Sequence, residues 1–225
     1  MSVVVMAEGD VDRAVVQAIA PGMKVLIPKD QATGREAATR RAALTAKQVD
    51  SREILLMLDW NTHTEDQLVA EVTRVLEKNW ERRGLEPTDR RWTYDDLRSM
   101  RLVLAGTPAD QRLKAWGVDR FMADDYLLAL CLRDDSLSAF CDGERHLTWI
   151  PQDAASLEAL LVELAEVFGK RGTVLSSSKR YIHLIRAAIG FEASRATFAE
   201  VLIKRAPETA RSEVLGDLRR QLTGS

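Results

Sequence analysis

The chain has 225 residues, of which 46% are hydrophobic and 29% are charged, and its formal net charge is −2. These values are typical of a globular protein that can bury a substantial core, and they exclude a disordered chain, which would have fewer apolar residues and a larger charge imbalance. The slightly acidic balance also excludes adhesion to nucleic acid that is driven by bulk charge alone.

The cysteines and the apolar segments indicate the compartment. Cys131 and Cys141 are the two cysteines of the sequence, and the apolar start of the chain has neither a basic lead-in nor a cleavage site. We therefore expect free thiols in a reducing compartment. No apolar run approaches the ~20 residues that a membrane span needs. The expectation is a soluble, cytoplasmic protein without membrane contacts.

Strand and helix patterns alternate over roughly the first half of the chain. Short apolar, β-branched runs predict strands, and apolar residues three or four positions apart predict helices between them. The predicted strands are 3–7, 23–27, 53–58 and 101–105, and the predicted helices are 11–19, 34–49 and a segment that begins at Thr64 or Asp66. Such alternation forms βαβ units. The sequence thus predicts an α/β fold with a mainly parallel, four-stranded sheet flanked by helices.

Beyond about residue 120 the pattern is helical alone. The predicted helices there are 124–133, 154–168, 178–189, 195–206 and 208–222. We therefore expect an α/β core over residues 1–120 and an all-helical extension over residues 121–225. Core or interface packing is the role expected of four tryptophans, Trp80, Trp92, Trp116 and Trp149.

Acidic side chains follow two of the predicted strands. Glu8 comes directly after the first strand and Asp59 directly after the third, and ligands of an open parallel sheet bind at the carboxyl ends of its strands. Asp12 lies on the first turn of the next helix, and strand alternation would aim Asn61 in the same direction as Asp59. Hard oxygen donors of this kind suit Mg²⁺ or Mn²⁺. The sequence therefore predicts a metal site at this edge.

A simpler interpretation of these acids is that they complement helix dipoles. Acidic residues at helix N-termini interact favourably with the macrodipole and cap exposed amides, and Asp10 or Asp12 alone would be assigned that role. The combination of strand-end placement and short spacing favours the metal site.

Three short motifs resemble those of Toprim domains, the topoisomerase–primase catalytic fold. Residues 8–12 (Glu-Gly-Asp-Val-Asp) are similar to the Glu-Gly-x-x-Asp signature. Residues 59–61 (Asp-Trp-Asn) resemble the Asp-x-Asp motif, with asparagine in place of the second aspartate. Residues 124–128 (Asp-Asp-Tyr-Leu-Leu) resemble an acidic helix start of stand-alone Toprim proteins and of the OLD (overcoming-lysogenization-defect) nucleases. The resemblance covers about the first 130 residues, and the helices predicted beyond them carry no such motif.

The resemblance implies a metal-dependent nuclease that hydrolyses nucleic-acid phosphodiesters with Mg²⁺ or Mn²⁺ as cofactor. In that scheme Glu8 ligates the metal and assists proton removal from water. Asp12, Asp59 and Asn61 would complete the coordination.

The resemblance also extends the expected site into the helical part and implies partners. Asp124 or Asp125 would serve a second ion. A catalytic cation is also needed near the developing charge, and Lys179 is the candidate because the polar loop ahead of its helix could deliver it to this edge of the sheet. The alternative for Lys179 is an ordinary solvated lysine. The implied partners are nucleic acid, with DNA favoured over RNA, and an ATPase protein, in phage defence or DNA repair.

Asn61 motivates a different class of function, a catalytically attenuated Toprim-like interaction or regulatory module in a larger complex. Asparagine removes one negative charge from the motif, and the C-terminal helices would then serve as a docking surface. A phosphotransfer receiver or a small phosphatase is disfavoured because no lysine follows a later strand in the expected place and no nucleophile motif is present.

Other features have commoner explanations than function. Clustered arginines could track a phosphate backbone, although a charged solvent face is commoner; they are Arg35, Arg40, Arg41, Arg82, Arg83, Arg90 and Arg91. Trp60 could stack a base, but a tryptophan after a strand is more often packed. His63 is a candidate acid or base because it lies close to Asp59 in the sequence.

Overall fold

The computed structural model describes residues 3–28, 34–48, 53–106, 113, 118, 120–131, 133, 177–188 and 191–224. The chain forms two compact units. The first unit contains Met1–Ala105 together with Leu218–Ser225, and the second contains Gly106–Asp217.

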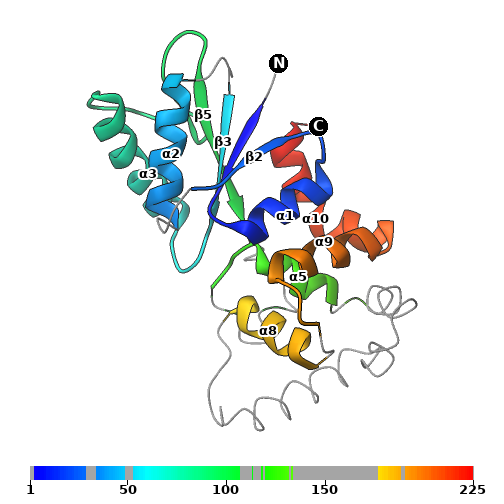
Figure 1. The fold of residues 1–225 in the computed structure, drawn as a ribbon. Helices are drawn as coiled ribbons and strands as arrows, with labels where there is room; N and C mark the ends of the chain where they lie inside the picture. Colours follow the sequence, from blue (N-terminus) through cyan, green and yellow to red (C-terminus); the bar gives the residue numbers. More distant parts are fainter. Residues whose placement is uncertain are drawn as a thin grey trace. The chain divides into compact units, whose positions relative to one another are not determined.

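The first unit is built on a five-stranded sheet with the strand order β2-β1-β3-β5-β4 (Figure 1). Its strands are β1 (Val4–Ala7), β2 (Lys24–Leu26), β3 (Glu53–Asp59), β4 (Arg91–Thr93) and β5 (Ser99–Ala105). Every pairing is parallel except that of β4 with β5. The expected α/β class and the mainly parallel sheet are therefore confirmed.

The prediction of four strands is wrong because β4 was missed. This strand has three residues, of which only Trp92 is buried, and it lies in a polar stretch. It pairs antiparallel with β5 at the edge of the sheet. So short a strand, with one apolar position, gives no periodic signal that distinguishes it from a loop.

Three helices flank this sheet: α1 (Asp10–Ile19), α2 (Arg35–Gln48) and α3 (Glu65–Trp80). Crossovers between parallel strands are right-handed. Across the sheet, the step from β1 to β2 goes in one direction, and the steps from β2 to β3 and from β3 to β5 go in the opposite direction. Helix α1 therefore lies on one face, and α2 and α3 lie on the other (Figure 1). Thr64 caps α3 in a capping box with Gln67, which confirms one of the two expected starts.

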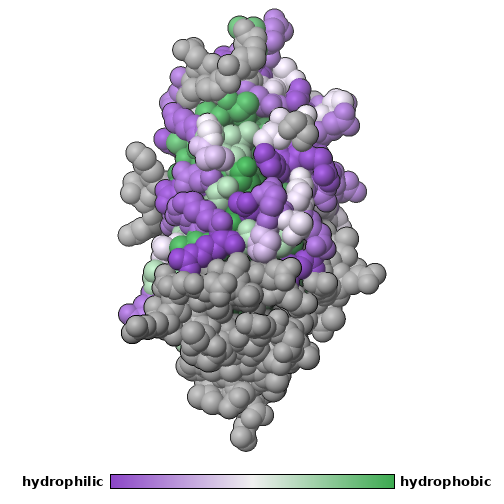
Figure 2. Space-filling view, turned by 90° about the vertical axis from the view of Figure 1, so that its right-hand side faces the viewer, coloured by the Kyte–Doolittle hydropathy of each residue, from purple (hydrophilic) through white to green (hydrophobic). Residues whose placement is uncertain are grey.

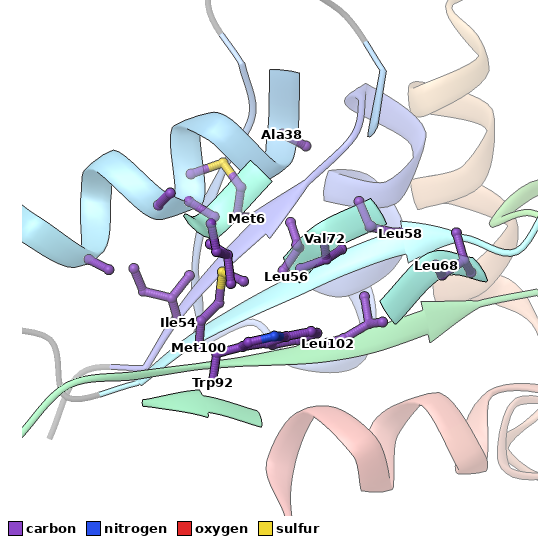
Figure 3. Close-up of a cluster of buried hydrophobic side chains, with 14 of the residues drawn as sticks. Met6, Ala38, Ile54, Leu56, Leu58, Leu68, Val72, Trp92, Met100 and Leu102 are labelled. Atoms are coloured by element: carbon purple, nitrogen blue, oxygen red, sulfur yellow. The ribbon is translucent and has the colours of Figure 1, made fainter. Parts of the chain in front are cut away.

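A large hydrophobic cluster of the first unit lies between the sheet and the two helices α2 and α3. Side chains from both layers meet there (Figure 3), among them Met6, Leu56 and Val72, each with no exposed surface. Trp80 and Trp92 are buried at its margin, as expected, and each indole N–H finds an acceptor: the Ala43 carbonyl at 3.1 Å and Thr73 Oγ1 at 2.9 Å, respectively. Trp116 and Trp149 lie outside the described residues.

The second unit is helical where the structure describes it. It contains α5 (Asp124–Cys131), α8 (Ser178–Ala188), α9 (Arg195–Arg205) and most of α10 (Glu208–Thr223), whose last turn belongs to the first unit. These helices confirm four of the five predicted C-terminal helices, and the fifth, 154–168, lies outside the described residues. Helix α5 is buried along its whole length and packs against α8 and α9.

The chain enters this unit through a glycine that no other residue could replace without strain. Gly106 has a φ of 115°, and a Cβ atom there would lie 2.8 Å from backbone atoms of Phe121 and Met122. The Gly106 N–H donates to the hydroxyl of Tyr126 at 3.1 Å, which fixes this turn against α5.

The one cysteine of the second unit that the structure describes is unreactive. Cys131 is a free, fully buried thiol, and burial raises its pKa to about 12. A thiol with so high a pKa is not a nucleophile at neutral pH. Cys141 lies outside the described residues.

The described surface is mainly polar. On the face seen in Figure 2, hydrophilic residues surround a narrower band of hydrophobic residues. Within the described ranges, the exposed large hydrophobic residues are Leu44, at 37%, and Leu97, at 67%. No helix among them combines the length and apolar character that crossing a membrane requires.

Truncation of Leu56 tests the core between the sheet and α2 and α3. Leu56 has no exposed surface, so Leu56→Ala is expected to lower the free energy of unfolding by about 2–5 kcal/mol through lost burial and a residual cavity. Leu97→Ala, the same change at an exposed position, is expected to alter it by less than about 0.5 kcal/mol. Denaturant titration measures both values, and equal losses would contradict the assignment of the core.

Candidate functional site

The carboxyl ends of β1 and β3 lie side by side. The two strands are adjacent and parallel, with Ala7 opposite Met57 in the register. Glu8 and Asp59 therefore leave the sheet at the same edge, and Oε1 of Glu8 accepts a hydrogen bond from the backbone N–H of Asp59 at 2.9 Å. The prediction that the two strand ends meet is confirmed. That the carboxylate of Asp59 also lies within reach of an ion bound by Glu8 stays a prediction.

Glu8 is a largely buried carboxyl group, and its surroundings act on its pKa in opposite directions. Desolvation by burial is the largest effect and raises the pKa of Glu8. The N–H of Asp59 and the positive charge of Arg35 oppose it, and the negative charge of Glu71 adds to it. The net result is a raised pKa, so Glu8 holds a proton more readily than an exposed glutamate does.

Asp12 lies at the start of α1, folded towards the turn that precedes the helix. Its side chain is buried, with 5% of the residue exposed. An oxygen of its carboxylate would lie 3.5 Å from a Cβ atom at Gly9. This position suits the helix-dipole interpretation as well as a metal-ligand role, and the ligand role stays a prediction. Asp10, by contrast, is exposed and pairs with Arg13 at 2.6 Å.

Asn61 does not continue the alternation of β3. The strand ends at Asp59, and Asn61 has a φ of 50°, in the left-handed region that asparagine tolerates better than most residues. The expectation that strand alternation aims Asn61 alongside Asp59 is therefore wrong, because the chain has already turned. The role of Asn61 as a metal ligand stays a prediction, which strand alternation no longer supports.

An ion pair that the sequence did not indicate lies beside Glu8 and Asp59. Nη1 of Arg35 is 2.9 Å from Oε2 of Glu71, and Nη2 donates to the backbone carbonyl of Asp59 at 3.4 Å. Arg35 is the first residue of α2, which follows β2. Helices that follow parallel strands begin at the carboxyl edge of the sheet, so the topology was the signal that could have identified Arg35.

We call this edge of the sheet, with its four acids and one arginine, the acidic edge. Its residues are Glu8, Asp12, Asp59, Glu71 and Arg35. Carboxylate oxygens at the ends of neighbouring strands have the donor chemistry that Mg²⁺ and Mn²⁺ prefer. In the part of the chain that the structure describes, no three acidic, histidine or cysteine side chains already converge as a metal-binding group. Glu8 and Asp59 are the pair around which such a group would be completed.

The remaining predicted site residues lie in the second unit, at the starts of α5 and α8. Asp125 accepts the backbone N–H of Met122 at 3.0 Å and the hydroxyl of Ser178 at 2.5 Å. Both Asp125 and Ser178 are fully buried. Asp125 therefore connects the first turns of the two helices, a structural role that the sequence did not indicate. Its assignment as a metal ligand stays a prediction.

Asp124, the neighbour of Asp125, lies in a charged environment. Burial raises the pKa of Asp124, and the positive charges of Arg195 and Lys179 oppose the shift. Nε of Arg195 is 3.3 Å from Oδ1 of Asp124. Lys179 is exposed on the first turn of α8, so Asp124 and Lys179 are close enough to interact through their charges. Their catalytic and metal-binding roles stay predictions.

The structure also describes the surroundings of the lesser candidates, whose functional roles stay predictions. Trp60 is partly buried against the core of the first unit. His63 is exposed, and its backbone N–H donates to the Trp60 carbonyl at 3.1 Å. Several of the clustered arginines pair with acids, as a charged solvent face would: Arg40 with Glu36, Arg90 with Glu65 and Arg91 with Glu53.

Comparison of the chain with known protein families, with characterised proteins and with solved structures finds no match.

Replacement of Glu8 by glutamine tests the energetic consequence of burying this carboxylate. Because burial raises its pKa above the ordinary value of 4.5, the stability gained from protonated Glu8 is fully present below pH 4.5 and is lost as the pH rises through the folded-state pKa. Glutamine is neutral at every pH and keeps an oxygen that can accept the N–H of Asp59. We expect Glu8→Gln to raise the thermal unfolding midpoint at neutral pH.

The pH dependence of that difference is the decisive measurement. The gap between Glu8→Gln and the wild-type protein should narrow as the pH is lowered towards 4.5, because the wild-type carboxyl group then becomes neutral as well. Thermal unfolding followed by circular dichroism across this range measures it. A gap that widens on acidification would contradict the raised pKa.

Proposed function

We propose that this chain is a metal-dependent nuclease that hydrolyses nucleic-acid phosphodiesters at its acidic edge, with Mg²⁺ or Mn²⁺ bound by Glu8 and Asp59. The observation that carries the proposal is the meeting of these two residues, in which Oε1 of Glu8 accepts the backbone N–H of Asp59 at 2.9 Å. Acidic residues that follow neighbouring parallel strands share the edge where α/β proteins bind their ligands.

The environment of Glu8 suits proton transfer as well as metal binding. A bound divalent ion would neutralise the phosphate and lower the pKa of a water molecule on it. The hydrogen bond from Asp59 fixes one oxygen of Glu8 and limits the rotation of its carboxylate. A carboxylate with a raised pKa is also a better proton acceptor near neutral pH than an ordinary glutamate.

The resemblance to Toprim proteins supports the wider assignment. It gives Asp12 and Asn61 as further ligands and Asp124 or Asp125 as the ligand of a second ion. It also supports DNA over RNA as the substrate, an ATPase partner and a role in phage defence or DNA repair. Two further parts of the proposal do not come from the motifs: Lys179 is the candidate for a catalytic cation near the developing charge, and a cytoplasmic location follows from the cysteines and the apolar segments.

Substitutions on either side of Gly9 test the nuclease proposal. Glu8→Gln is expected to reduce Mn²⁺-dependent cleavage of a labelled oligonucleotide about 100-fold or more, as loss of a proton acceptor and ligand does. Asp10→Asn is the matched control, because Asp10 is exposed and pairs with Arg13, and it should retain activity within about twofold. Full activity in excess chelator, or equal activity of the two variants, would refute the proposal.

A second candidate function is a non-catalytic interaction module. The ion pair between Arg35 and Glu71, at 2.9 Å, favours it because a resident guanidinium already neutralises part of the acidic edge. Together with Asn61 in the Asp-x-Asp motif, this arrangement is compatible with an α/β core whose chemistry is attenuated.

Calorimetric titration with Mn²⁺ distinguishes the two candidates. The nuclease proposal predicts a binding isotherm for the wild-type protein that disappears in Asp59→Asn, because the edge then loses a negatively charged ligand. The interaction module predicts no heat of binding that depends on Glu8 or Asp59. A wild-type isotherm that Glu8→Gln and Asp59→Asn leave unchanged would place the metal elsewhere and favour the module.

A further inference from the structure

Arg35 introduces a positive charge into the acidic edge. Its side chain is 12% exposed, and that of its partner Glu71 is 26% exposed. The side chain of Arg35 is thus mostly buried, with a small part of its surface exposed to solvent. Its charge acts on Glu8 and opposes the effect of burial there. Arg35, Glu8 and Asp59 therefore belong to one electrostatic cluster.

The guanidinium of Arg35 uses little of its hydrogen-bonding capacity. Nη1 is engaged with Glu71 at 2.9 Å, but the bond from Nη2 to the Asp59 carbonyl is long, at 3.4 Å. Nε is buried and makes no hydrogen bond to the described residues. An arginine carries five N–H groups in a planar fork, so each Nη of Arg35 keeps one N–H that no hydrogen bond to the described residues uses.

Arg98, in the same unit, shows how a purely structural arginine differs. Its Nε and Nη2 donate to Oδ2 of Asp95 at 2.8 and 2.5 Å, and its Nη1 donates to the carbonyls of Ala46 and Lys47, both at 3.0 Å. That fork is saturated by the protein and fastens the β4–β5 turn to the end of α2. The fork of Arg35 is not saturated in this way.

We propose that Arg35 binds a non-bridging phosphate oxygen of the nucleic acid at the acidic edge. This inference rests on the proposed nuclease function and adds the residue that anchors the substrate. A phosphodiester that approaches Glu8 and Asp59 carries the same sign of charge as they do, so a fixed cation must compensate the repulsion. Guanidinium groups bind phosphate oxygens through paired, charge-assisted hydrogen bonds, and Glu71 holds the Arg35 guanidinium in place when no phosphate is bound.

A structural ion pair between α2 and α3 is the competing explanation, and it makes a different prediction for Glu71. Arg35→Gln and Glu71→Gln both remove the pair. If the pair only supports the fold of the edge, the two variants should impair nucleic-acid binding alike. If Arg35 anchors phosphate, only its own loss should weaken binding, while loss of Glu71 frees the guanidinium and removes a negative charge.

The test is fluorescence anisotropy with a labelled single-stranded DNA oligonucleotide, in Ca²⁺ to prevent turnover. Arg35→Gln is expected to weaken binding about tenfold, the loss of one charge-assisted hydrogen bond. Arg40→Gln on the same helix is the matched control, because Arg40 is 58% exposed and pairs with Glu36, and it should change binding by less than about twofold. Glu71→Gln should bind as tightly as the wild-type protein or more tightly.

The outcomes separate the inference from the function on which it rests. If Arg35→Gln does not fold, Arg35→Lys replaces it and should weaken binding about threefold or more, since lysine lacks the planar fork. The inference about Arg35 is overturned if the Arg35 variant binds DNA as tightly as the wild-type protein, or if Glu71→Gln loses as much DNA affinity as the Arg35 variant. In either case, metal-dependent cleavage by the wild-type protein would still uphold the nuclease function. A wild-type protein that neither binds nor cleaves the oligonucleotide overturns both.

Discussion

The parallel pairing of β1 with β3 is the constraint on which the rest of the first unit depends. Val4–Ala7 is buried along its whole length, and so are the residues of β3 from Ile54 to Leu58. Both faces of these two strands are apolar and covered, as in a parallel sheet with helices on each side, so their burial strongly favours the pairing. The same pairing determines which residues meet beyond the strand ends, and it places Glu8 against the backbone of Asp59.

At the acidic edge, the cost of burying the Glu8 carboxylate is partly offset by nearby positive charge and a hydrogen bond. Burial of Glu8 is unfavourable for its ionised form, and the N–H of Asp59 together with the guanidinium of Arg35 reduces that penalty without removing it. Perturbed carboxyl groups of this kind concentrate at functional sites, although structural ion-pair networks also produce them. The position at the carboxyl edge of a parallel sheet favours function, because a core stabilised for its own sake would place an apolar residue there.

The second unit uses its acids differently. Asp125 accepts hydrogen bonds from the Met122 N–H and the Ser178 hydroxyl, so it connects the first turns of α5 and α8. Asp124 interacts with the positive charges of Arg195 and Lys179. Two adjacent aspartates at one helix start thus have different environments: Asp125 is held by hydrogen bonds, and Asp124 interacts mainly with positive charges. A pair of neighbouring acids in a motif need not share one role.

The sequence by itself determined the four parallel strands, most helix bounds and the meeting of Glu8 with the end of β3, because apolar periodicity and strand-end placement are local properties that parallel pairing converts into proximity. Only the tertiary structure decided the edge strand β4, the turn at Asn61, the Asp125–Ser178 bond and the Arg35–Glu71 pair. Strand β4 is too short to give a periodic signal, the turn at Asn61 depends on a backbone dihedral, and the other two depend on contacts between residues far apart in the chain. The partners of charged side chains are the hardest feature to predict from sequence, because many acids could pair with one guanidinium and only the packed structure determines which of them does.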